Sequence, residues 1–464
     1  FLNVGLQCLS HIEPISAYFL TGKYAEEINA ANPYGTGGHL ARGFAKLQEL
    51  LWQRSSRSQT PAQIYSTLSK FAPTRHLFQD SEQQDAQELL SHLLDALHED
   101  LNLAPVRERP GAASAKRSVA RNPDESDEED ERLAQLEREK GEEYVAALGW
   151  MHHLMRHKSM LVDLFQGQLR SRLTCGVCGH QSKTFDPFLS VSLPLLTHMR
   201  TLEDALQHFL KDESLTGDDR WKCPKCKKRV DAVKKIDIWK LPPVLVIHLK
   251  RFEFDTATCR FQKINTKIRT PLTLDLSSFI LSQECLPEEN RESFIYEVIS
   301  VANHSGHFGR GHYTATCRHP VDGNYYHFND TDVCEVRNED EIITNEAYVL
   351  FLMRKDSADW ERQSISRPEV WPHRVSRRNS VMLPAVWEAV GRGPSPKASE
   401  KAEGQNDSEN VSPKSRTSQD ENNGNGEPRR RRRDLQEEST PGTPTTPTTQ
   451  RTPAAADSDS DRGS

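Results

Sequence analysis

Apolar positions recur at helical spacing near the start of the chain. The repeating residues are Leu2, Leu6, Leu9 and Ile12, which predicts a buried helix that begins at or before the first residue. A second helix is predicted over residues 38–53. Cys8 falls in the middle of the first helix, where neither a helix N-terminus nor a neighbouring cation would activate its thiol. We therefore interpret Cys8 as a small core residue.

A third helical segment covers residues 81–100. Its apolar stripe is formed by Ala86, Leu89, Leu90, Leu93, Leu94 and Leu97, which predicts a core helix. Ser81 followed three residues later by Gln84 fits a capping box, so the first turn is expected to present Gln83, Gln84 and Asp85. Polar residues in a first turn usually satisfy the free end of the helix, and this is the ordinary interpretation of Asp85.

Strand patterns prevail from residue 185 onward. Apolar or alternating segments predict strands over residues 185–195, 243–254, 294–304 and 347–354. The first half of residues 243–254 is largely apolar on both faces, so this strand is expected inside a sheet. The strand over residues 347–354 is expected to close the sheet. Helices interleaved with mostly antiparallel strands predict an α+β fold.

Residues 309–330 are expected to form a β-hairpin that carries the candidate chemistry. A four-residue loop over residues 319–322 would put His312 directly opposite Asn329, with Cβ atoms roughly 4.5–5.5 Å apart. A tighter turn would instead pair His312 with Val333. An imidazole held by a side-chain carbonyl is the base and its orienting partner in a nucleophilic triad. The alternative is a hairpin with two ordinary surface polar residues.

Five other histidines are weaker candidates. His304 and His307 precede the hairpin in a glycine-rich loop, and the sequence offers no acidic partner near them. His152, His153 and His157 have metal-like spacing, but they lack a nearby carboxylate. We interpret these three as an exposed helix face.

Composition limits how much of the chain can fold. Hydrophobic residues make up 35% of the 464 residues, below the usual share in globular proteins. Residues 103–149 contain a strongly acidic block, which predicts a disordered insertion. Residues 355–464 are rich in Pro, Thr and Ser, which predicts a disordered tail. The five-arginine run at residues 429–433 fits either a nuclear localisation patch or a solvated basic cluster.

Charge and hydropathy exclude several classes of protein. The net charge of −7 argues against a generic nucleic-acid binder, and no run of about 18 apolar residues is present to span a membrane. The first residues lack the pattern of a secretory signal and do not include a starting Met, so we expect a fragment or a processed piece. Nine cysteines without an export signal favour a reducing compartment, the cytoplasm or the nucleus.

Four cysteines have the spacing of a zinc site. Cys175 and Cys178 form one C-x-x-C pair, and Cys223 and Cys226 form another. Four thiolates would complete a tetrahedral shell around zinc, which predicts a structural zinc ion. A redox dithiol would explain one pair but not both.

Together these motifs resemble the catalytic domain of the ubiquitin-specific proteases, which are papain-like cysteine deubiquitinases. The resemblance spans residues 1–354 apart from the acidic insertion. It is carried by FLNVGLQCLS, SEQQDAQELL, the two cysteine pairs, FDPFLSVSLPL, VLVIHLKRF, YEVISVANH, GRGHYTA and YYHFND. It implies a fold with a thumb, a palm and zinc-ribbon fingers. The family's nucleophilic cysteine stands immediately before the segment that here is FLN, so the resemblance implies a nucleophile just before Phe1.

The resemblance also implies roles for individual residues. His312 would be the general base and acid, Asn329 would orient its ring, and Asp330 would be a second polar partner. Gln84 and Asp85 match the family's contact to the ubiquitin tail, and the paired cysteines match its zinc ribbon. The implied activity is thiol-dependent hydrolysis at the C-terminal glycine of ubiquitin, with ubiquitin and ubiquitinated proteins as partners.

Two other functions stay open. One is a ubiquitin-binding scaffold that truly lacks a catalytic cysteine, which the sequence immediately before Phe1 would reveal. The other is a zinc-ribbon nucleic-acid binder that uses the arginine run, although the cysteine pairs lack the stacking aromatics that such a binder needs. Its nucleic-acid affinity would depend on salt. Without an upstream cysteine, the sequence as it stands is expected to have no hydrolase activity.

Overall fold

The computed structural model describes residues 1–52, 58–78, 84–105, 123–255, 259–281, 294–307 and 309–355. All of them belong to the first of two compact units, Phe1–Ser395. The disordered tail predicted over residues 355–464 therefore lies outside the described residues, except for its first residue. Within the described residues, no helix is both long and apolar enough to cross a membrane.

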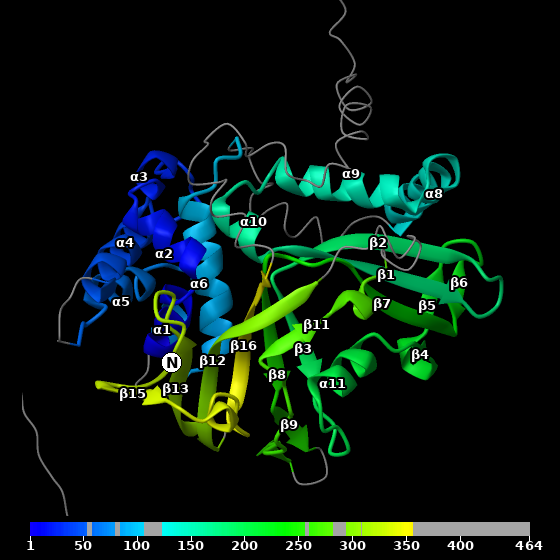
Figure 1. The fold of residues 1–464 in the computed structure, drawn as a ribbon. Helices are drawn as coiled ribbons and strands as arrows, with labels where there is room; N and C mark the ends of the chain where they lie inside the picture. The colour runs from blue at the N-terminus through cyan, green and yellow to red at the C-terminus, as the bar shows by residue number, and fades with distance from the viewer. Residues whose placement is uncertain are drawn as a thin grey trace, which may run out of the picture. The chain divides into compact units, whose positions relative to one another are not determined.

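The N-terminal part of the chain is helical, as its apolar spacing predicted. The helices are α1 (Leu2–Ser10), α2 (Glu13–Leu20), α3 (Tyr24–Glu27), α4 (His39–Trp52), α5 (Ala62–Leu68), a 3₁₀ helix (Arg75–Phe78) and α6 (Ala86–Asp100). The predicted first helix is divided, because Pro14 lacks an N–H group and is best tolerated in the first turn of a new helix. Figure 1 shows these helices on one side of the main sheet.

The start of α6 differs from the prediction. The helix begins at Ala86, and Asp85 is its N-cap, with Oδ1 accepting a hydrogen bond from the backbone N–H of Gln87 at 2.7 Å. The expected capping box of Ser81 and Gln84 is therefore wrong, because a carboxylate directly before the leucine stripe caps the helix instead. Ser81 itself lies outside the described residues. The stripe is buried, as predicted for a core helix.

An eight-stranded sheet lies against these helices. Its strands are β3 (Ser190–Pro194), β8 (Val244–Lys250), β11 (Thr273–Asp275), β12 (Ile295–His307), β13 (Arg310–Arg318), β14 (Tyr325–Asn329), β15 (Asp332–Val336) and β16 (Ala347–Arg354). Their order is β15-β14-β13-β12-β16-β8-β3, with β11 also paired to β12. As predicted, β8 has neighbours on both sides. The prediction that β16 closes the sheet is wrong, because β16 lies inside the sheet, between β12 and β8. Its first six residues are buried, as is usual for a strand in the middle of a sheet.

A second sheet has four strands. Its order is β2-β1-β7-β4, formed by β1 (Gly167–Cys175), β2 (Gln181–Phe188), β7 (Ala232–Lys240) and β4 (Glu213–Leu215). Two short pairs are β5 (Trp221–Cys223) with β6 (Lys228–Val230), and β9 (Phe252–Asp255) with β10 (Arg260–Lys263). The strand predicted over residues 243–254 is divided at Arg251. The buried side chain of Arg251 donates hydrogen bonds to the carbonyl oxygens of Ala347, Ile264 and Thr266.

Part of the predicted disordered insertion is helical. The structure contains α8 (Pro123–Lys140) and α9 (Glu142–Leu154), followed by α10 (Met160–Phe165) and later α11 (Leu202–Phe209). The prediction of disorder over residues 103–149 is therefore wrong for residues 123–149, while residues 106–122 lie outside the described part. The helix α9 buries Val145, Ala146, Leu148, Trp150 and Met151. Both α8 and α9 lie along β2 (Figure 1).

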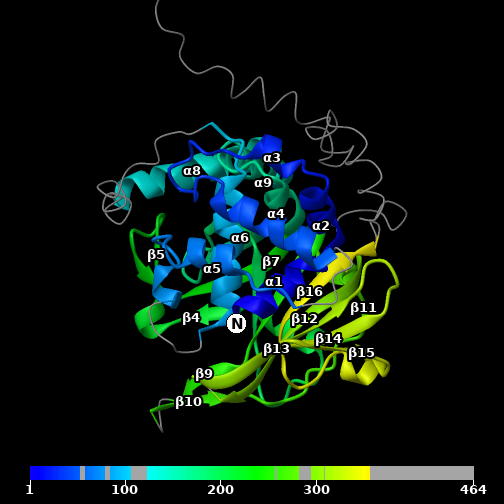
Figure 2. The same cartoon turned by 90° about the vertical axis from the view of Figure 1, so that its left-hand side faces the viewer.

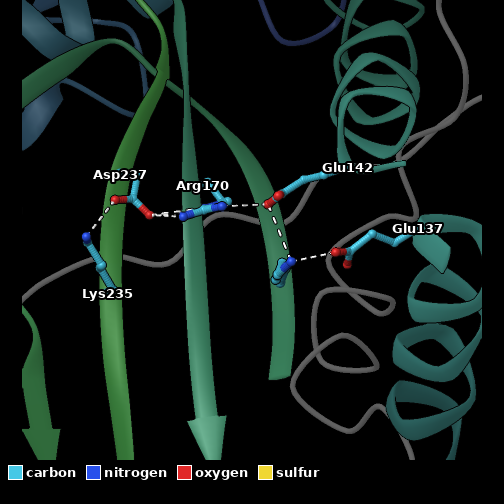
Figure 3. Close-up of polar contacts among 6 residues, drawn as sticks. Glu137, Glu142, Arg170, Lys235 and Asp237 are labelled. Carbon is cyan, nitrogen blue, oxygen red and sulfur yellow. Dashed lines mark hydrogen bonds and ion pairs between the residues drawn. The ribbon is translucent and has the colours of Figure 1, made fainter. Parts of the chain in front are cut away.

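Charged residues also attach the insertion to the second sheet. Arg170 on β1 lies between Asp237 on β7 and Glu142 at the start of α9, and its guanidinium donates to both carboxylates (Figure 3). Lys183 on β2 pairs with Glu137 of α8 and lies 3.7 Å from Glu142. Acidic residues that suggested disorder therefore have basic partners on strands that are distant in the sequence.

Candidate functional site

The predicted hairpin is formed by β13 and β14, but in a different register. Arg318 pairs with Tyr325, and the backbone N–H of His319 donates to the carbonyl oxygen of Asn324. The four-residue loop therefore covers residues 320–323 and begins one residue later than predicted. The last loop position is taken by Gly323, whose φ of 77° lies in the left-handed region that favours glycine. The prediction that His312 lies directly opposite Asn329 is therefore wrong by two residues.

His312 nevertheless contacts Asn329. A shift of two residues keeps both side chains on the same face of the sheet, and diagonal neighbours remain within reach of long side chains. Nε2 of His312 lies 2.7 Å from Oδ1 of Asn329. Because a carbonyl oxygen can only accept, Nε2 carries the proton and donates it. Nδ1 is then the nitrogen that can take up or release a proton.

Asp330 lies beside the same ring nitrogen. Its Oδ2 atom is 3.9 Å from Nε2 of His312, and its carboxylate is 72% exposed. This distance is too long for a hydrogen bond, so Asp330 contributes charge near the ring while Asn329 is its direct partner.

The helix α1 packs against β13, the strand that carries His312. Figure 2 shows the start of the chain, marked N, beside β13. The start of α1 lies within electrostatic range of the Asp330 carboxylate. The N-terminal end of α1, which favours negative charge, therefore lies on the side of Asp330, the acidic neighbour of His312. Cys8, further along α1, is fully buried, as expected for a core residue.

Asp85 joins the start of α6 to the central strand β16. Its Oδ2 atom accepts a hydrogen bond from the hydroxyl of Tyr348 at 2.6 Å, while Oδ1 caps the helix. The hydroxyl of Tyr313 accepts the backbone N–H of Ala86 at 3.3 Å. These bonds fix the first turn of α6 against the strand that carries His312. Gln84 stands directly before the cap and is half-buried.

Sequence reasoning missed a cluster of rings beside Asp85. Ring centroids lie 4.8 Å apart for His248 and Tyr348, 5.2 Å apart for Phe252 and His304, and 4.7 Å apart for His304 and Tyr313. Burial lowers the pKa of both His248 and His304 to about 4, so these two imidazoles are neutral at pH 7. The rings belong to five different strands, and no spacing within one segment could have predicted that they meet.

His304 is not in a loop, as the sequence suggested, but in β12, and it is 2% exposed. A Cβ atom at Gly311 would lie 2.2 Å from Nε2 of His304 and 2.4 Å from the carbonyl oxygen of Ser305. Glycine at position 311 therefore allows the His304 ring to pack against the backbone directly before His312.

The four paired cysteines come together between β1 and β5. The Sγ atoms of Cys175 and Cys226 are 3.9 Å apart, and those of Cys178 and Cys223 are 3.7 Å apart. Zn–S bonds of about 2.3 Å in a tetrahedron separate two sulfurs by about 3.8 Å. Backbone N–H groups of Val177 and Cys178 also point at Sγ of Cys175, as suits a thiolate. The donor set thus fits a zinc ion with no open position.

The chain is similar in sequence to a set of hydrolases. The sequence model of the family described as "Ubiquitin carboxyl-terminal hydrolase" matches residues 1–352. Ubiquitin carboxyl-terminal hydrolase 2 of Rattus norvegicus is 35% identical over 356 residues, which cover 76% of this chain and 52% of the rat protein. Ubiquitin carboxyl-terminal hydrolase 4 of Saccharomyces cerevisiae (strain YJM789) is 33% identical over 376 residues, which cover 76% of this chain and 38% of the yeast protein. The chain therefore spans about half the length of these relatives, or less.

The fold is also similar to a chain in a solved structure, that of the SAGA DUB module of Ubp8, Sgf11, Sus1 and Sgf73 bound to monoubiquitin. The TM-score is 0.55 at 24% identity, and the match covers 76% of this chain and 66% of that chain. At this level of identity the likeness concerns the fold alone. It confirms the predicted α+β class.

Proposed function

We propose, from the premise that this chain belongs to the ubiquitin carboxyl-terminal hydrolase family, that the protein is a thiol-dependent deubiquitinase. It would hydrolyse the bond that follows the C-terminal glycine of ubiquitin. The observation that carries the proposal is the 2.7 Å contact between Nε2 of His312 and Oδ1 of Asn329, on the strand that packs against α1. In the family's terms, the N-terminal helices are the thumb, the eight-stranded sheet is the palm, and the four-stranded sheet is the fingers.

A cysteine immediately before Phe1 would complete the site. The N-terminal end of α1 would favour its thiolate, and Nδ1 of His312 would accept the thiol proton. The thiolate attacks the glycine carbonyl carbon of ubiquitin, and Nδ1 gives the proton to the departing amine. His312 then takes a proton from water, which cleaves the thioester and releases ubiquitin with its C-terminal carboxylate.

Asn329 and Asp330 would act on the ring from the other side. The side-chain carbonyl of Asn329 accepts the Nε2 proton and fixes both the tautomer and the orientation of the imidazole. Asp330, at 3.9 Å, would stabilise the imidazolium that forms when the thiol ionises.

Gln84, Asp85 and the neighbouring rings would receive the tail of ubiquitin. Asp85 is held on both oxygens by the protein, so its carboxylate is fixed in position before any ligand binds. Tyr313, Tyr348 and His304 are buried rings that pack against one another and make its surroundings apolar. A fixed carboxylate beside apolar rings suits an extended segment that carries N–H donors and cationic side chains.

We also infer a structural role for zinc at the paired cysteines. Cys175 and Cys178 from the first knuckle and Cys223 and Cys226 from the second would hold the ion between β1 and β5. Four sulfur ligands leave no place for water, so the ion would stabilise the fingers. None of the eight cysteines of the described residues is in a disulfide, which suits a cytoplasmic or nuclear protein.

The proposal is tested on the chain extended by its natural upstream residues. We expect this protein to cleave a fluorogenic amide at the C-terminus of ubiquitin, and His312→Ala to lower kcat by at least about 100-fold. His152→Ala is the matched control, because His152 is exposed on α9. Full activity in His312→Ala would overturn the assignment. Ubiquitin binding without cleavage, together with the absence of an upstream cysteine, would instead favour a ubiquitin-binding scaffold.

A further inference from the structure

We propose a second metal site, for a divalent cation such as zinc, formed by His98, Glu99 and His157. His98 and Glu99 lie in the last turn of α6, and His157 follows the C-terminal end of α9. One ligand atom from each residue lies within 4.8 Å of the other two. In the sequence, the histidines around position 157 have no carboxylate nearby, but α6 supplies one in the folded chain.

The spacing of the two imidazoles suits two ligands of one ion. Nε2 of His98 is 3.0 Å from Nδ1 of His157. Two Zn–N bonds of about 2.0–2.1 Å at a tetrahedral angle place their nitrogens about 3.3–3.4 Å apart. The rings therefore need to separate by only a few tenths of an ångström. Without the ion this contact is a hydrogen bond, and on binding its proton moves to the other nitrogen of its ring or is released to water.

Neighbouring groups already orient two of the ligands. Nδ1 of His98 lies 2.7 Å from the hydroxyl oxygen of Ser159, and Nδ2 of Asn32 donates to Oε2 of Glu99 at 2.7 Å. When Ser159 accepts the Nδ1 proton, Nε2 of His98 holds a lone pair, which is the form that binds a metal. Histidine ligands of zinc usually have such a partner on their second nitrogen.

Burial distinguishes this cluster from a similar one on the surface. His98 is 5% exposed and Glu99 is 3% exposed, so a bound cation would offset the charge of a carboxylate that has little access to water. A second group of possible ligands, made of His76, Glu88 and His92, is largely exposed. Surface groups of this kind bind metals weakly, because water competes for the ion.

The buried cluster lies away from the candidate catalytic residues. Along α6, His98 stands 13 residues beyond Asp85, which corresponds to about 20 Å at 1.5 Å per residue. The ion would link the end of α9 to α6, and thus the insertion to the thumb. This proposal does not depend on the proposed hydrolase activity.

The proposal is tested on the full chain, which is equilibrated with zinc and passed through gel filtration. The zinc that remains bound to the protein is then measured. The wild-type chain should retain one more equivalent of zinc than His157→Asn. Asparagine can still donate a hydrogen bond to His98, so the variant should keep the metal-free fold, which melting without added zinc would check. The result is the difference in zinc content between the wild type and His157→Asn. Zinc at the paired cysteines is the same in both proteins and does not affect this difference. His152→Asn should retain as much zinc as the wild type.

A second measurement uses a milder change. Ser159→Ala keeps all three ligands but removes the partner that orients His98, and it should weaken zinc binding at this site by about 10–100-fold. Equal zinc content in the wild type and in His157→Asn would overturn the proposal. So would a loss of the extra equivalent in His92→Gln instead, because that result would assign the ion to the exposed cluster.

Discussion

Arg170 is the residue whose replacement should most weaken the attachment of the insertion. Its side chain is 7% exposed, and its guanidinium donates to Oδ2 of Asp237 and, at 2.8 Å, to Oε1 of Glu142. Arg170→Met removes the charge and the donors but keeps most of the aliphatic volume. Asp237, 8% exposed, then keeps Lys235, at 3.4 Å, as its charged partner among the described residues.

We expect Arg170→Met to lower the free energy of unfolding by about 3 kcal/mol. Removing one member of a buried ion pair costs about 3–5 kcal/mol, because the other charge is left buried. Lys235 still neutralises part of the Asp237 charge, and Glu142 can turn toward Lys183, 3.7 Å away, so the lower end of this range applies. For domains of 150–250 residues such a loss lowers the unfolding midpoint by about 6–12 °C, and somewhat less in a larger one.

Thermal unfolding followed by circular dichroism measures this change, and hydrogen exchange locates it. Exchange should accelerate in α9, whose first residue is Glu142, more than in α4, which lies elsewhere in the fold. Lys46→Met is the control, because its pair with Glu49 is exposed and is worth at most about 0.5 kcal/mol. The double variant Arg170→Met with Asp237→Leu should recover much of the loss. A loss below about 1 kcal/mol, or no recovery in the double variant, would refute this reasoning.

Three further predictions concern the site and its supports. Gly311→Ala should lower kcat at least about 10-fold in a chain extended by the upstream cysteine, because the new Cβ would clash with His304 and the backbone of Ser305. Gly149→Ala should be nearly neutral in the same assay, because the atom nearest to its new Cβ is 3.5 Å away. Cys226→Ser should lower the zinc content by one equivalent, measured by metal analysis, and should expose the fingers to protease. Stability should fall as the pH drops from about 6.5 to 4, because burial lowers the pKa of His248 and His304 to about 4 and the unfolded state binds more protons in this window. Each histidine contributes about 1.4 kcal/mol per pH unit there, so His248→Asn should flatten the pH dependence of the unfolding free energy.

Local spacing predicted those parts of the molecule whose partners lie close together in the sequence. The two cysteine pairs are an example, because each C-x-x-C turn presets two ligands and a single long-range contact then completes the set. The leucine stripe of α6 is another, since the helical period alone decides which face is buried.

The insertion could not be predicted in this way. Its acidic residues resemble a disordered segment when they are considered alone. Their partners, Arg170 and Lys183, follow Glu142 by 28 and 41 residues. Both partners lie on strands of the four-stranded sheet. The ring cluster beside Asp85 has the same origin, because His248, His304 and Tyr348 meet only after the sheet has formed.

The hairpin shows why a wrong register still led to the observed contact. Side chains alternate between faces along a strand, so an error of one residue would have placed His312 and Asn329 on opposite faces, while an error of two leaves them on the same face. Alternating apolar residues such as Tyr313 and Cys317, both buried, fix which face is which. Loop length then decides only whether the partner is direct or diagonal, and a diagonal neighbour is still within reach of an imidazole. The pairing of His312 with Asn329 therefore rests on the alternation of the two strands, which the sequence contains, more than on the geometry of the loop, which it leaves open.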